Sequence, residues 1–168
     1  MQIRPETPSD YPAIAEIHRR AFERENEAQL VHRLRQGDRY IPELSLVAEQ
    51  NHLIVGHILF SYIDLVGQDT LQVLGLAPLA VQPEYQRQGI GSALVRAGLN
   101  AADTRGESLV IVLGHPQFYR RFGCEPSVRY GIESPFPVPE DVFMVKPLNQ
   151  YQERYQGKVI YPAAFSEV

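Results

Sequence analysis

The sequence predicts an α/β (α+β) protein in which helices flank a mixed, mostly antiparallel central sheet of about seven strands. Two segments of strand length, Leu44–Glu49 and Leu53–Ile63, are separated by turn residues and should form a hairpin. Other segments carry apolar residues at helical spacing, most clearly the one that follows Gly89. Because that helix separates two strands, Glu107–Leu113 should pair parallel to Thr70–Val81 through a right-handed crossover.

The N-terminal part of the chain predicts an edge strand followed by two helices. Residues 3–5 form the strand, and Pro5 restricts it to an edge because proline cannot donate to a ladder. Apolar residues recur at helical spacing through residues 14–22 and again through 26–34, and Gly37 should end the second helix.

Pro78 lies inside the predicted Thr70–Val81 strand. Proline removes a hydrogen-bond donor from a ladder, so this position should be a bulge or a place where pairing is released. An edge strand would also accept the proline, and both interpretations stand.

The C-terminal part of the chain predicts smaller elements. Gln117–Phe122 should form a short helix, and Val128–Ile132 and Val142–Leu148 should form two further strands. Residues 1–148 then make up one domain, and residues 149–168 form a tail that packs back on it.

Length and composition exclude several classes of protein. A chain of 168 residues is long enough for one domain with a substantial core. Its single cysteine, Cys124, excludes an internal disulfide framework, and its net charge of −4 argues against a nucleic-acid partner. The apolar runs are too short for a membrane span and the first residues do not form a signal peptide, so we expect a cytoplasmic protein with no membrane partner. His18, His32, His52 and His57 show no ligand spacing, so no metal site is expected.

The segment around Gly89 and Gly91 predicts an anion site. It joins the Thr70–Val81 strand to a helix, whose first N–H groups lack intrahelical acceptors and carry partial positive charge. The glycines leave no side chain between those groups and a ligand, and Arg87 adds a charge that can bind phosphate through two hydrogen bonds. The segment therefore predicts a pyrophosphate site, and a helix start without a ligand is the alternative.

Spacing separates the families that bind phosphate in this way. A P-loop would need a lysine after the last glycine, and a dinucleotide fingerprint would need a third glycine or alanine where Leu94 stands. Gln86-Arg87-Gln88-Gly89-Ile90-Gly91 instead fits Gln/Arg-x-x-Gly-x-Gly/Ala at every position. This stretch resembles the acyl-coenzyme A signature of the GNAT superfamily of N-acetyltransferases.

A second stretch carries the same resemblance. Tyr119-Arg120-Arg121-Phe122-Gly123 matches the Tyr-x-x-x-Gly-Phe pattern frequent in GNAT proteins up to its last position, where Cys124 replaces phenylalanine. Together with His115-Pro116, it is similar to the YhbS-like branch of the superfamily. The general resemblance covers Ile3 to Leu148.

The resemblance implies the GNAT fold, with a central pair of parallel strands that splay apart, and transfer of an acetyl group from acetyl-coenzyme A. The two N-terminal helices would form one wall of the acceptor cleft. A backbone N–H near Ala80 or Val81 would polarise the thioester carbonyl, and strand backbone would pair with the pantetheine arm. Backbone amides after the strand would hold the pyrophosphate. The residues expected to bind coenzyme A are Leu79, Ala80, Val81, Gln86, Arg87, Gln88, Gly89, Ile90, Gly91, Ser92 and Tyr119.

Three residues are candidates for catalysis under this resemblance. Tyr119 would donate a proton to the leaving thiolate, since a phenol with a pKa of ~10 suits a thiol near ~8.5, although it could also be an aromatic anchor. Many GNAT enzymes use a glutamate on the central strand as base, but residues 73–81 contain no ionisable side chain. His115 and Glu27 are the remaining candidates for the base, or the amine arrives neutral and needs none.

The leading interpretation is an N-acetyltransferase in which a primary amine attacks acetyl-coenzyme A directly. Because the central strand lacks an acid, a non-catalytic acyl-coenzyme A-binding or sensing module is an alternative, as is an acyltransferase with another acyl donor. The acceptor could be a small molecule or a peptide, and the chain could form a homodimer.

Overall fold

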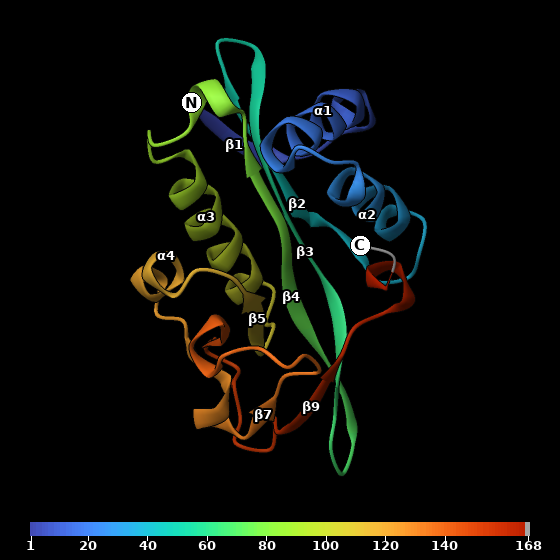
Figure 1. Ribbon diagram of the computed structural model, residues 1–168, viewed down its shortest axis with the longest axis vertical. Coiled ribbons are helices and arrows are strands. Elements are labelled where there is room, and N and C mark those ends of the chain that lie inside the picture. Colours follow the sequence, from blue (N-terminus) through green and yellow to red (C-terminus); the bar gives the residue numbers. More distant parts are fainter. Residues whose placement is uncertain (167–168) are drawn as a thin grey trace.

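A twisted sheet runs the length of the molecule in the computed structural model, which describes residues 1–166 (Figure 1). Its strands are β1 (Gln2–Pro5), β2 (Tyr40–Gln50), β3 (Leu53–Val66), β4 (Thr70–Val81), β5 (Leu109–Leu113), β6 (Glu125–Pro126), β7 (Ile132–Glu133), β8 (Phe143–Pro147) and β9 (Gly157–Ile160). The nine strands found in residues 1–166 follow the order β1-β2-β3-β4-β5-β8-β6, and β9 pairs with both β3 and β7. All pairs are antiparallel except β4 with β5 and β7 with β9. The predicted fold class is therefore confirmed.

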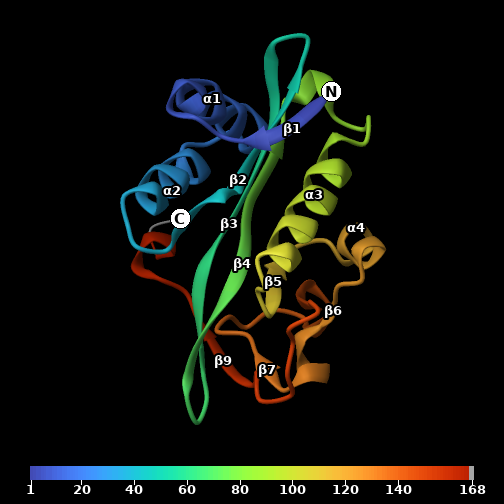
Figure 2. The same ribbon diagram turned by 180° about the vertical axis from the view of Figure 1, so that it is seen from behind.

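The helices lie on both faces of this sheet. They are α1 (Tyr11–Phe22), α2 (Asn26–Arg35), α3 (Ile90–Thr104) and the short α4 (Pro116–Tyr119). The 3₁₀ turns are η1 (Pro8–Asp10), η2 (Pro83–Tyr85), η3 (Arg120–Phe122), η4 (Ser127–Tyr130), η5 (Glu140–Val142) and η6 (Ala163–Phe165). Viewed from either side, α3 covers one face and α1 and α2 cover the other (Figures 1 and 2).

Apolar packing holds each helical layer to the sheet. The stripe of α3 buries Leu94 and Val95 against Phe60 of β3, so the helix start is fixed relative to the end of β4. On the opposite face, Ile14 and Leu34 pack against the sheet beneath α1 and α2. These contacts set the positions of the helix ends that form the site.

A buried polar network ties α1 and α2 to the sheet. The His18 and His57 rings meet at 2.8 Å between Nε2 and Nδ1, and His57 Nε2 lies 2.9 Å from Ser45 Oγ and 3.2 Å from Glu6 Oε1. Arg35 donates to both oxygens of Glu6, at 2.8 and 2.9 Å. Burial lowers the pKa of His18 and of His57, whereas Arg35 and the other hydrogen-bond partners lower the pKa of Glu6 against the opposing effect of its burial. The fold thus contains two neutral imidazoles beside a carboxylate.

The parallel strands β4 and β5 separate soon after they meet. Their paired residues are Leu74 with Val110 and Gly75 with Ile111. On the other side of β4, pairing with β3 continues to Val81, with a register shift that gives β4 an extra residue around Pro78. The predicted bulge at Pro78 is confirmed, and the edge of β4 that follows it is open toward β5.

The predicted strand Val128–Ile132 is wrong. Its residues form the 3₁₀ turn η4, which Gly131 ends at a φ of 70°, and the strand β7 begins only at Ile132. Alternating apolar residues imitate a strand here, but Val128 is 49% exposed and only Ile132 enters the core.

The segment that follows β8 extends the sheet. In it, β9 pairs with Asp64–Val66, the far end of β3, beyond the part of β3 that pairs with β2. β9 also pairs parallel to β7, so it joins the sheet to the C-terminal loops. The turn η6 then brings Phe165 against the face that α1 and α2 cover.

Candidate active site

The start of α3 lines a cavity of about 400 Å³, which we call the α3 cavity. Gly89 is the N-cap residue at a φ of 84°, and no side chain caps the first turn. The first N–H groups of a helix have no intrahelical acceptor, so they are free to bind a ligand here. Val81, Arg87 and Gly91 also line the cavity. The structure therefore brings the end of β4 and the glycine turn together, as the sequence predicts.

Two side chains predicted to bind coenzyme A, those of Gln86 and Gln88, instead form hydrogen bonds with the backbone of the turn. Gln86 Nε2 donates to the carbonyl oxygen of Val81 at 3.1 Å, and Gln88 Nε2 lies 3.5 Å from the carbonyl oxygen of Glu84. These contacts fix the path of the chain between β4 and α3. Backbone N–H groups, and not the glutamine amides, are thus the donors available to an anion.

Arg121 adds a cation that sequence reasoning missed. It comes from η3, lines the α3 cavity, and donates from its guanidinium to Ser92 Oγ in the first turn of α3. It also lies 5.3 Å from the ring centroid of Phe118. The sequence hint was that Arg121 lies inside the Tyr119–Gly123 motif, but only the fold shows that this motif lies next to the glycine turn.

The open edge of β4 offers backbone groups between the two strands. Gln82 N–H donates to the carbonyl oxygen of Val55 on β3 at 2.8 Å. Successive residues of a strand point their N–H groups to opposite sides, so Ala80 N–H also faces β3, whereas those of Leu79 and Val81 face the open edge. Val81 is therefore the donor available at the predicted oxyanion position, and Ala80 is not.

A second cavity, of about 530 Å³, occupies the space where β4 and β5 separate, and we call it the splay cavity. Its walls come from α1, α2, β4, the end of β5, α4 and η6, and they include Phe22, Glu27, Leu79, His115, Tyr119 and Phe165. All three predicted catalytic residues line it. Phe118 lines both this cavity and the α3 cavity, so the two spaces adjoin at that ring.

Tyr119 is held tightly in its wall. It is 8% exposed, its ring meets Phe118 edge-on at 4.9 Å, and a Cβ added at Gly114 would lie 2.6 Å from its Cε2 atom. Burial raises the pKa of the Tyr119 hydroxyl, so the phenol keeps its proton at neutral pH. Tyr119 can therefore act as a hydrogen-bond donor in the splay cavity.

The two candidate bases, Glu27 and His115, differ in whether other side chains form hydrogen bonds with them. Both carboxylate oxygens of Glu27 accept hydrogen bonds from Arg24, the longer at 2.9 Å. His115 lies at the N-cap of α4 with its side chain exposed, and no described residue forms a hydrogen bond with its ring. Of the two candidate bases, His115 is thus the one whose ring no described side chain occupies.

Similarity to known proteins identifies the family of this chain. The sequence model described as an acetyltransferase (GNAT) domain matches residues 2–127. The chain belongs to the GNAT acetyltransferase family. Escherichia coli YhbS, an uncharacterised N-acetyltransferase, is 40% identical over 146 residues, which are 86% of each chain.

Two solved GNAT structures resemble the whole chain. The E. coli YhbS structure in complex with CoA has a TM-score of 0.90 and 36% identity, covering 98% of this chain and 91% of that one. A GNAT acetyltransferase from Brucella melitensis in complex with acetyl-CoA has a TM-score of 0.80 and 31% identity, covering 98% and 97%.

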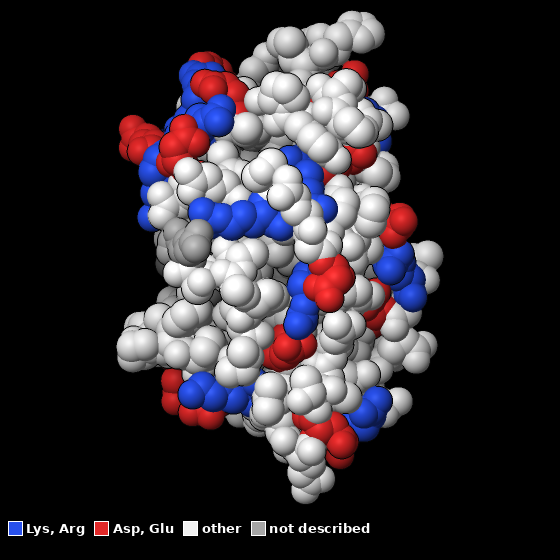
Figure 3. All heavy atoms as spheres, turned by 90° about the vertical axis from the view of Figure 1, so that its right-hand side faces the viewer, with Lys and Arg blue, Asp and Glu red and all other residues white. Residues whose placement is uncertain are grey.

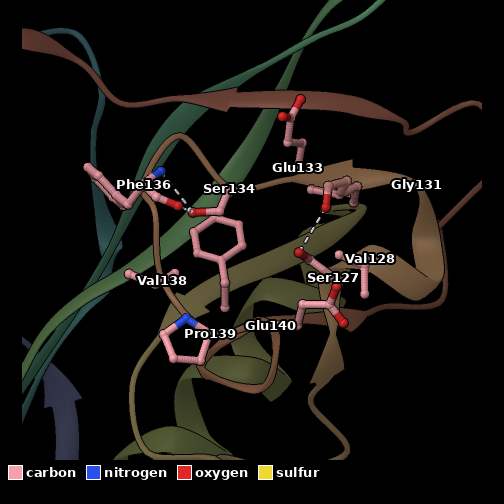
Figure 4. A pocket seen from close by; sticks show the side chains of 11 residues that line it. Ser127, Val128, Gly131, Glu133, Ser134, Phe136, Val138, Pro139 and Glu140 are labelled. Carbon is pink, nitrogen blue, oxygen red and sulfur yellow. Dashed lines mark hydrogen bonds between the residues drawn. The ribbon is translucent and has the colours of Figure 1, made fainter.

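A further cavity, of about 360 Å³, lies apart from these GNAT elements, under the loop that leads into β8 (Figure 4). Ser127 Oγ donates to the carbonyl oxygen of Ile132 at 2.8 Å, and Phe136 N–H donates to Ser134 Oγ at 3.0 Å. These serines satisfy the loop backbone, and none of the predicted site residues lies here.

Within residues 1–166, no group of three or more His, Cys, Asp and Glu side chains is placed to hold a metal ion. No helix in the same range has both the length and the apolar character needed to cross a bilayer.

Proposed function

We propose that this protein transfers the acetyl group of acetyl-CoA to a primary amine by direct attack. The observation that carries the proposal is the junction of the two cavities at Phe118, beside the open edge of β4. The α3 cavity offers backbone N–H groups and Arg121 for a pyrophosphate, and the splay cavity offers an acid–base pair for the acceptor. CoA in the YhbS structure and acetyl-CoA in the Brucella structure support the same assignment.

The reaction needs three groups in the region between the cavities. The amine nitrogen attacks the thioester carbonyl carbon and forms the new C–N bond, and the carbonyl oxygen becomes an oxyanion. The N–H of Val81 on the open edge stabilises this oxyanion. Collapse of the intermediate breaks the C–S bond and expels CoA as a thiolate, while the nitrogen loses one proton.

Tyr119 stabilises the departing thiolate through a hydrogen bond. Because burial raises the pKa of its hydroxyl, complete transfer of its proton to a thiol with a pKa of ~8.5 is uphill. Donation without full transfer still lowers the energy of the developing negative charge. His115 accepts the proton that the amine releases, since it lines the splay cavity and no described residue forms a hydrogen bond with its ring.

The proposal is tested by measuring CoA binding and amine-dependent thiol release on the same samples. Gly91→Glu places a carboxylate against the pyrophosphate, so it should abolish CoA binding in calorimetry and turnover with it. His115→Ala should keep CoA affinity and lower kcat, because the attacking amine then loses its general base. If the wild-type protein binds acetyl-CoA but releases no thiol with any primary amine, a binding or sensing role replaces the enzyme.

A further inference from the structure

The walls of the splay cavity are mainly apolar. Leu30 from α2, Leu79 from β4 and Phe165 from η6 line it. Phe22 and Leu113 also line it, and they remain 38% and 42% exposed although they are large and apolar. Large apolar side chains left open around one cavity are typical of a surface that covers an apolar ligand.

The cavity has no unpaired carboxylate among its described wall residues. Glu27 is the acid that lines it, and Arg24 binds both of its oxygens. The side chain of Glu27 is 8% exposed, so a second cation would have to displace Arg24 to reach it. An ammonium buried elsewhere in the cavity would lose its hydration without gaining a carboxylate partner.

Phe165 closes one side of this cavity and is itself supported by other rings. Its centroid lies 4.9 Å from that of Tyr161, and Tyr161 stacks at 5.6 Å on Phe136, a residue of the cavity shown in Figure 4. This series of rings fixes Phe165 from behind. The C-terminal segment therefore contributes one wall of the splay cavity through Phe165.

Charge on the neighbouring surface does not point to a polyionic acceptor. On the side of the molecule that carries α1 and α2, cationic and anionic groups are intermixed and no large patch of one sign forms (Figure 3). A polyamine or a strongly charged peptide would therefore find no large patch of opposite charge on this side.

We propose that the acceptor is a primary amine carried on an uncharged aliphatic or aromatic body, which packs between Phe22, Leu30 and Phe165. The proposal rests on the proposed acetyl transfer, since it names the substrate class of the same site. The reactive nitrogen lies toward His115 and Tyr119, and the apolar body gains affinity from the area that it buries.

The test compares n-hexylamine with 1,6-diaminohexane as acceptors of acetyl-CoA in the thiol-release assay. The two share a carbon chain and differ by one terminal ammonium group. We expect kcat/KM to be higher for n-hexylamine by about tenfold or more, because the second ammonium is buried without a partner. Equal or faster acetylation of the diamine would overturn the proposal and leave acetyl transfer itself intact.

Phe165→Ala tests the wall that limits acceptor length. Removing the ring should raise kcat/KM for n-octylamine relative to n-hexylamine by up to about tenfold, since two further methylenes gain burial. Val128→Ala is the matched control, because Val128 is exposed and lines the cavity of Figure 4 instead. An unchanged octylamine preference in Phe165→Ala, with CoA affinity retained, would overturn the placement of the acceptor body.

A direct binding measurement separates the failure of this proposal from failure of the proposed function. Binding of each amine to the CoA-loaded protein is followed by NMR chemical-shift changes. If n-hexylamine binds and 1,6-diaminohexane does not, but neither is acetylated, the apolar site stands and acetyl transfer to it is wrong. If neither binds and neither reacts, both proposals are wrong.

Discussion

Replacing Gly91 with leucine should make the protein more stable and a poorer CoA binder. A Cβ at this position would lie 3.8 Å from Phe118 Cζ and 3.8 Å from Val81 Cγ2, which is ordinary van der Waals contact. The backbone can therefore accept a side chain here without moving. Because leucine favours a helix over glycine, the free energy of unfolding should rise by up to about 1 kcal/mol.

The leucine side chain would extend into the α3 cavity, since Val81, Gly91 and Phe118 all line it. It keeps the pyrophosphate from the first N–H groups of α3, and the loss of one hydrogen bond to a charged group costs about 1.5–3 kcal/mol. The dissociation constant for CoA should therefore rise by roughly 10- to 150-fold. Calorimetry measures the affinity, and thermal unfolding without ligand measures the stability.

Gly106→Leu is the matched control for this variant. Gly106 follows the C-terminal end of α3 at a φ of 86°, with open space around the added Cβ. A left-handed backbone costs a non-glycine residue about 1–2 kcal/mol, so this variant should be less stable and bind CoA normally. If Gly91→Leu binds CoA as tightly as the unmodified protein, the pyrophosphate does not lie at the start of α3.

Three other changes test the remaining parts of the site and the network. Tyr119→Phe should lower kcat by roughly 10- to 100-fold with CoA affinity unchanged, and an unaltered kcat would remove the hydroxyl from the mechanism. Gly114→Ala should displace the Tyr119 ring, which an added Cβ would approach to 2.6 Å, and should lower kcat similarly while the protein stays folded by circular dichroism. Burial lowers the pKa of His18 and His57, so the unfolded chain binds more protons below about pH 6.5 and stability falls there as pH drops. The lowered pKa of Glu6 adds a further loss of stability below about pH 4.5. Urea titrations that give the same free energy of unfolding at pH 7.5 and at pH 5 would contradict this account.

The parts of the fold that follow from local pattern were predictable. β4 has the predicted bounds, Thr70–Val81, and the proline rule for ladders placed the bulge at Pro78. The glycine turn was informative because it combines backbone freedom with the start of a helix, and both are local properties. Sequence reasoning therefore found the glycine turn and Val81 of the α3 cavity, but it missed Arg121.

The parts that depend on distant contacts were not predictable. The pairing of β9 with the end of β3 joins segments far apart in the chain, and no local pattern encodes it. Arg121 reaches the first turn of α3 only because η3 packs there. Arg24 donates hydrogen bonds to the Glu27 carboxylate, a side-chain contact that no sequence pattern reveals. The order of Val128, Tyr130 and Ile132 suggested a strand because alternation alone does not reveal which side chains are buried.

The pairing of β3 with two different partners has a consequence for how the chain matures. During synthesis, Asp64–Val66 are made long before Gly157–Ile160, so this stretch of β3 waits with one edge unpaired. Loss of the last segment by a premature stop or by proteolysis would leave that edge exposed as a template for association. An intact C-terminal segment therefore protects the chain from aggregation and also completes the wall of the splay cavity through Phe165.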